Sequence, residues 1–84
     1  MIRKLMIKDE ENWSKLYNGY ADFYKVPMNK EILDTLWGWI HDDNHIVNGI
    51  CFELEGKITG IAHYRTMPRP IKGQYIGFLD DLFV

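Results

Sequence analysis

The sequence carries one conspicuous pair of reactive side chains, the adjacent carboxylates of Asp80 and Asp81 inside the apolar stretch GFLDDLFV at residues 77–84. A carboxylate in such surroundings can hold an ammonium group. It can also act as a base, once burial or a like charge raises its pKa from about 3.9. On a regular strand the two side chains point to opposite faces, so their coupling is weak unless a β-bulge intervenes. The alternative is structural, because acidic residues also protect exposed sheet edges.

Other candidate groups give weaker signals. His41 and His45 have the i, i+4 spacing of metal ligands and flank two aspartates. No third strong ligand has a spacing typical of a metal site, so we expect no metal site. His63 is more typical of a satisfied histidine in a sheet than of a base. Cys51 is typical of a small buried hydrophobe, with no acidic or histidine partner that indicates a nucleophile.

Composition limits the classes of function. The 84 residues allow one domain with a modest core, and 46% of them are apolar, as in a globular protein. Ten basic and twelve acidic residues give a net charge of −2 without a basic stripe, which argues against nucleic-acid binding. The single cysteine fits a reducing compartment, and no apolar run approaches the ~18 residues of a membrane helix. We therefore expect a soluble cytoplasmic protein with no membrane or nucleic-acid partner.

Two helices are predicted in the first half of the chain. A short strand over residues 2–7 precedes acidic residues that favour a helix start at Asp9. Aromatic and apolar residues then recur every three or four positions up to a stop at Pro27. Asn29 is a predicted cap for a second helix over residues 30–40. Trp37 and Trp39 cannot share a face of that helix, so one of them should be half exposed at a pocket or an interface.

The second half of the chain has the period of strands. Alternating residues predict strands at 48–56 and 57–65, joined by a tight hairpin at Glu55 and Gly56. Two prolines and a glycine predict a longer loop over residues 67–73, followed by a strand at 74–84. The predicted order is β-α-α-β-β-β, an α+β domain in which an antiparallel sheet carries both helices and the first strand lies beside the hairpin.

These features together resemble the N-terminal half of a GNAT-superfamily N-acetyltransferase. The resemblance covers essentially all of residues 1–84 as part of a single domain. It depends on FYxVP at residues 23–27, on the hairpin EGKITGIAHYR at 55–65, and above all on FLDDLFV at 78–84. In the family, the strand that matches FLDDLFV runs directly into a glycine-rich turn, R/Q-x-x-G-x-G/A, whose amides bind the pyrophosphate of acetyl-CoA. This sequence ends before such a turn, so the resemblance implies that the C-terminal half is missing.

The resemblance implies a reaction and a set of residues for it. An amine attacks the thioester of acetyl-CoA directly, which requires an uncharged amine and a donor for the developing oxyanion. Asp80 occupies the acidic position that contacts the amine or relays its proton in related enzymes, so it is the expected catalytic and substrate-binding residue. The backbones of Leu82, Phe83 and Val84 are expected to bind the acetyl-CoA arm. Tyr24 is a possible substrate-binding residue, although core packing is the more typical role of such an aromatic stripe.

Two kinds of function are compatible with these features. The first is an acetyl-CoA-dependent N-acetyltransferase, whose acceptor is a small-molecule amine or a protein N-terminal or lysine amine. The second is a non-catalytic module that acts through self-association or partner binding. Because the last strand would leave an apolar edge uncovered, we expect the isolated chain to form a homodimer or to require the missing C-terminal half.

Overall fold

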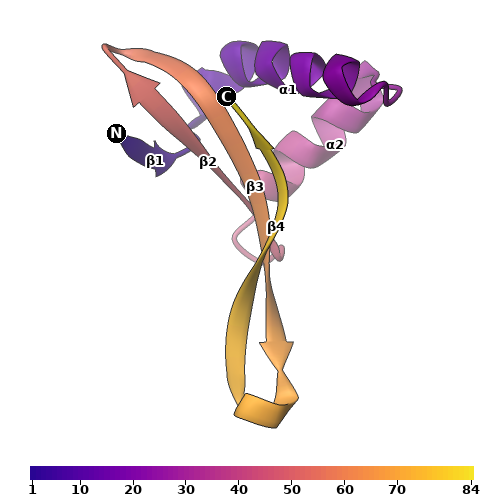
Figure 1. The fold of residues 1–84 in the computed structure, drawn as a ribbon, viewed down its shortest axis with the longest axis vertical. Helices are drawn as coiled ribbons and strands as arrows, with labels where there is room; N and C mark the ends of the chain where they lie inside the picture. The colour runs from indigo at the N-terminus through magenta and orange to yellow at the C-terminus, as the bar shows by residue number, and fades with distance from the viewer.

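A computed structural model describes residues 1–84 of the protein (Figure 1). The strands are β1 (Ile2–Lys4), β2 (Val47–Leu54), β3 (Lys57–Arg69) and β4 (Gln74–Phe83). The helices are α1 (Glu10–Tyr24) and α2 (Lys30–Ile40), and short 3₁₀ turns cover Ile7–Asp9 and Pro70–Lys72. All strand pairs are antiparallel, in the order β1-β2-β3-β4. The predicted α+β class and the β-α-α-β-β-β order are thus confirmed.

Local sequence signals account for most element boundaries. The side chain of Asn29 accepts a hydrogen bond of 2.9 Å from the amide of Ile32 and so caps α2, as predicted. Glu55 and Gly56 both have positive φ, at 54° and 78°, which is the geometry of a two-residue hairpin turn between β2 and β3. Lys25 ends α1 in the left-handed region, with φ of 56°.

Two predicted boundaries are wrong. The first strand ends at Lys4 instead of residue 7, because the carboxylate of Asp9 binds the amide of Met6 at 2.7 Å and turns the chain. The predicted loop at 67–73 is shorter than expected, since β3 continues to Arg69, which pairs with Gln74 of β4. β2 pairs with β3 only as far as Arg65. Pro68 therefore has a neighbouring strand, β4, on one side only, and its missing N–H interrupts no second ladder of hydrogen bonds. The resulting β3–β4 hairpin projects from the body of the protein (Figure 1).

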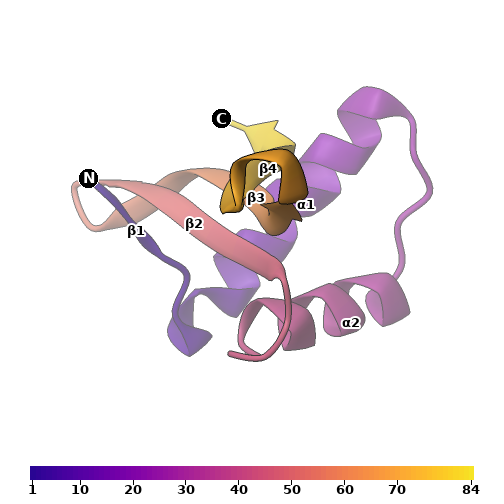
Figure 2. The same ribbon diagram turned by 90° about the horizontal axis from the view of Figure 1, so that it is seen from below.

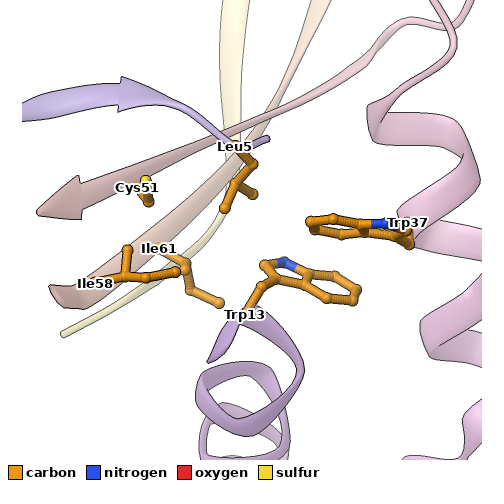
Figure 3. Close-up of a cluster of buried hydrophobic side chains, with 6 residues drawn as sticks. All are labelled: Leu5, Trp13, Trp37, Cys51, Ile58 and Ile61. Atoms are coloured by element: carbon orange, nitrogen blue, oxygen red, sulfur yellow. The ribbon is translucent and has the colours of Figure 1, made fainter. Parts of the chain in front are cut away.

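Both helices pack on the same side of the sheet (Figure 2). The core between them consists of Leu5, Trp13, Trp37, Cys51, Ile58 and Ile61 (Figure 3). Trp13 from α1 and Trp37 from α2 lie with ring centroids 4.7 Å apart, so the two indoles join the helices to each other as well as to the sheet. Cys51 is buried and unpaired, as its position in the strand predicted.

The other side of the sheet has no helix over it. Six residues form what we call the open sheet face, and they line an apolar hollow of about 320 Å³: Ile2, Ile50, Phe52, Ala62, Leu82 and Val84. Phe52 and Leu82 are 42% and 57% exposed, so this face is largely in contact with solvent in the single chain.

Candidate functional site

A β-bulge places the two adjacent carboxylates. In the β3–β4 register His63 pairs with Asp81 and Tyr64 pairs with Leu79, so Asp80 is an extra residue in β4. The bulge breaks the alternation of side chains, and both Asp80 and Asp81 line one hollow. The bulge is the exception that the sequence analysis named, so the opposite faces expected for a regular strand do not apply here.

This space, the bulge hollow, lies between α2, the start of β2 and the bulge, and has a volume of about 880 Å³. Apolar side chains of α2 and of the segment at the start of β2 form part of the lining: Ile32, Leu36, Trp39, Ile46 and Val47. Trp39 is 44% exposed there and stacks on His45 with ring centroids 4.7 Å apart, whereas Trp37 is buried. The prediction of one half-exposed tryptophan is confirmed.

Asp81 ends a chain of hydrogen bonds that begins at the buried indole of Trp13. Its Oδ2 accepts a hydrogen bond of 3.0 Å from the Tyr17 hydroxyl and lies 2.9 Å from Nδ1 of His63. The indole N–H of Trp13 donates to Nε2 of His63 at 2.9 Å. Because an indole nitrogen is only a donor, Nε2 of His63 must be the acceptor. The imidazole proton therefore lies on Nδ1 and is donated to Asp81.

The environment keeps Asp81 ionised. Burial alone would raise the pKa of Asp81, but hydrogen bonds from His63, Tyr20 and Tyr17 outweigh burial and hold the pKa below its ordinary value. The same contacts act in the opposite direction on the phenols. Burial and the charge of Asp81 raise the pKa of Tyr17, and hydrogen bonding to Asp81 raises the pKa of Tyr20 to about 12. Asp81 is thus an anion whose direct partners are neutral donors.

Asp80 is paired differently. Its carboxylate oxygens lie 3.0 Å from Nε and 2.9 Å from Nη2 of Arg65, an ion pair with two contacts. The guanidinium also lies over the ring of Phe78, 5.2 Å from the centroid. The negative charge of Asp80 is therefore compensated within the protein, unlike that of Asp81.

The other predicted site residues lie at varying distances from the carboxylates. Tyr24 is 57% exposed, packs against Tyr20 and does not line the bulge hollow, so the structure does not bring it to Asp80. Its role in substrate binding stays a prediction. Tyr17 and His63 do line the hollow, and sequence reasoning missed them as site residues. The only signal for Tyr17 was its place in the aromatic stripe of α1, which does not distinguish a site from a core.

Leu82 and Phe83 end the edge strand β4, and Val84 follows it. Leu82 and Phe83 pair with β3 on one side, and the order of the sheet leaves the other side of β4 without a partner. A Cβ at Gly60 would lie 3.3 Å from the carbonyl oxygen of Phe83, so this glycine permits the close approach of the two strands. The role of these three backbones in binding acetyl-CoA stays a prediction.

The two helix-end histidines pack against tryptophans, His41 on Trp37 and His45 on Trp39. No group of three or more histidine, cysteine, aspartate or glutamate side chains is arranged to hold a metal ion. Neither helix has the length and apolar character needed to cross a membrane.

Comparisons with known proteins show which fold this geometry belongs to. No protein-family profile matches the sequence. The D-amino-acid N-acetyltransferase HPA3 of Saccharomyces cerevisiae is 28% identical over 86 residues, which cover 100% of this chain and 53% of that protein. The crystal structure of the ribosomal-protein-alanine N-acetyltransferase of Brucella melitensis biovar Abortus 2308 superposes with a TM-score of 0.78 at 20% identity. It is covered over 55% of its length and this chain over 100%.

The chain has the fold of the N-terminal half of a GNAT N-acetyltransferase. The resemblance to this half of a GNAT N-acetyltransferase, expected above all from FLDDLFV, is therefore confirmed. The chain spans about half the length of the curated relative it matches. Within the GNAT fold, the bulge hollow lies on the helix-covered side of the sheet, beside the edge strand that carries the acidic pair.

Proposed function

We propose that residues 1–84 form the acceptor-binding part of a single GNAT-type acetyltransferase domain, which transfers the acetyl group of acetyl-CoA to an amine. One observation carries the proposal. In a GNAT fold, the bulge at Asp80 brings two carboxylates and a tyrosine to one hollow beside a free strand edge. The acceptor is a small-molecule amine or the N-terminal or lysine amine of a protein.

In this reaction, the amine nitrogen bonds to the acetyl carbon, the C–S bond breaks, and CoA leaves as the thiol after the amine loses a proton. Asp80 and Asp81 would hold and orient the amine, which replaces a random encounter by an aligned one. Asp80 can contact the amine directly if the ammonium group exchanges with Arg65. The unpaired edge at Leu82, Phe83 and Val84 would hold the pantetheine arm and the thioester carbonyl through backbone groups.

The pyrophosphate of acetyl-CoA requires a further element. The turn R/Q-x-x-G-x-G/A does not occur in residues 1–84. We propose that the pyrophosphate site belongs to the part of the GNAT domain that this chain does not match. The 84-residue chain alone is then expected to bind acetyl-CoA negligibly, which isothermal titration calorimetry measures.

A chimera tests the proposed function. Residues 1–84 replace the matched half of the yeast relative, folding is checked by circular dichroism, and release of the CoA thiol is followed with acetyl-CoA and a panel of amines. We expect amine-dependent thiol release, which Asp80→Asn and Asp81→Asn each reduce. A folded chimera that releases no thiol with any amine would contradict the proposal.

Self-association is a second candidate function, favoured by the open sheet face and the free edge of β4. We propose that two copies of the single chain cover these surfaces in a homodimer, since exposed apolar edges recruit partners. Sedimentation should show a dimer at tens of micromolar, and Leu82→Glu should shift it to monomer. A monomeric parent chain would contradict this candidate.

The free, buried Cys51 supports the further proposal of a cytoplasmic location.

A further inference from the structure

The charges that line the bulge hollow are not balanced. Three carboxylates line it, those of Glu31, Asp80 and Asp81, against the one guanidinium of Arg65. Arg65 and Asp80 compensate each other through their two contacts. The uncompensated charges are those of Glu31, on the exposed rim, and Asp81, whose side chain is only 19% exposed. An anion that is this much buried attracts a cation more strongly than one at the surface, because water screens it less.

The position of Asp81 is also fixed before any ligand arrives. Tyr17 and His63 both bind Oδ2 of Asp81, and Trp13 holds the ring of His63 from its other side. Neutral donors orient the carboxylate without cancelling its charge. A carboxylate that is held in this way is suited to bind an ammonium ion with little loss of side-chain freedom.

The side of the hollow that α2 forms carries several apolar side chains next to those of Glu31 and Thr35. It includes the exposed indole of Trp39 and the side chains of Ile32 and Leu36 on α2. A ligand whose ammonium group reaches Asp81 would therefore place the rest of its body against aromatic and aliphatic side chains.

A carboxylate on the ligand would have no free cation to meet. Arg65 is the one guanidinium in the hollow and already binds Asp80. If Arg65 turned to the ligand, Asp80 would lose its partner. The adjacent negative charges of Asp80 and Asp81 would then repel each other.

From these observations we infer that the bulge hollow binds a primary ammonium ion attached to an apolar or aromatic body, without a carboxylate beside the amine, and that Asp81 holds the ammonium group. This inference rests on the proposed function, because it specifies the class of acceptor at the same site. It predicts arylalkylamines and alkylamines as better ligands than free amino acids.

Binding to the 84-residue chain tests the inference without acetyl-CoA. Three ligands share one phenyl body: phenethylamine has the amine alone, 3-phenylpropionate has the carboxylate alone, and phenylalanine has both. Each is titrated into ¹⁵N-labelled protein, and the indole N–H signal of Trp39 and the amides of Asp80 and Asp81 are followed. We expect phenethylamine to saturate with Kd on the order of 1 mM or tighter, phenylalanine to bind about tenfold more weakly, and 3-phenylpropionate not to shift these signals.

Three variants locate the ammonium contact. Asp81→Asn keeps the shape of the side chain and should weaken phenethylamine binding about tenfold, whereas Asp80→Asn should weaken it less. Glu31 lies on the exposed rim, so Glu31→Gln should leave the fold intact and should weaken binding by about twofold in low salt. If Asp81→Asn does not fold, the charge claim is judged on Glu31→Gln and on the loss of phenethylamine affinity with added salt.

The outcomes separate this inference from the proposed function. Equal or tighter binding of phenylalanine or 3-phenylpropionate, absence of saturable phenethylamine binding, or a folded Asp81→Asn with parent affinity would each overturn the inference. Selective phenethylamine binding together with an inactive folded chimera would support the inference and contradict acetyl transfer. Acetyl transfer by the chimera without discrimination against amino acids would contradict the inference alone.

Discussion

The buried hydrogen bond between Trp13 and His63 gives the sharpest prediction about stability. Both side chains are 1% exposed, and the indole N–H lies 2.9 Å from Nε2 of His63. Trp13→Phe removes the donor and leaves a buried acceptor without a partner, which costs about 1–3 kcal/mol. The smaller ring also leaves a cavity of up to about 40 Å³, which adds ~1 kcal/mol at ~24 cal/mol per Å³. The expected loss in the free energy of unfolding is therefore about 2–4 kcal/mol.

Urea denaturation followed by circular dichroism measures this loss. With an m value of about 1 kcal/mol/M, the midpoint should fall by roughly 2–4 M, or the variant should be unfolded in buffer if the parent is less stable than that. The matched control is Trp39→Phe, because Trp39 is 44% exposed and its indole N–H makes no hydrogen bond within the chain. Its loss should stay below about 1 kcal/mol.

The same structure predicts a tautomer. Long-range ¹H–¹⁵N correlation spectra of the parent should show the proton of His63 on Nδ1, as its contacts with Asp81 and Trp13 require. Equal losses for Trp13→Phe and Trp39→Phe, or a His63 proton on Nε2, would refute the reasoning.

Two further predictions concern packing and pH. A Cβ at Gly49 would lie 2.8 Å from a leucine methyl group, so Gly49→Ala should cost about 1–3 kcal/mol in urea denaturation. The matched control Gly38→Ala, with open space around it in α2, should stabilise the chain by about 0.5–1 kcal/mol, and the opposite order would contradict the packing described. Hydrogen bonds from Arg3 hold the pKa of Asp9 below its ordinary value, so the stability that Asp9 contributes is present above the ordinary carboxylate range and is lost as the pH falls through the lowered pKa. The Asp9→Asn variant should therefore have a lower free energy of unfolding than the parent at neutral pH, and the two should become equal in acid. Asp34→Asn removes one partner of an exposed ion pair and should change the free energy of unfolding little at any pH.

Much of the fold follows from short stretches of sequence. The cap at Asn29 and the turn at Glu55 and Gly56 are decided by hydrogen bonds and backbone preferences within a few residues. Both features are therefore predictable without knowledge of the rest of the molecule. The continuation of β3 to Arg69 is different, because the partner strand β4 stabilises a segment whose prolines favour a loop when they are considered alone.

The sequence by itself determined that Asp80 and Asp81 lie in the last strand of an α+β domain, and it supplied the motif by which the domain resembles GNAT acetyltransferases. Only the tertiary structure decided what each carboxylate contacts. The register between β3 and β4 makes Asp80 the bulged residue and sets Asp81 opposite His63, which lies 18 positions earlier in the chain. Such a register depends on packing among strands and helices that are distant in sequence. It therefore cannot be predicted from a local sequence pattern. The same packing brings Trp13 to His63 and thereby assigns the imidazole proton that Asp81 accepts.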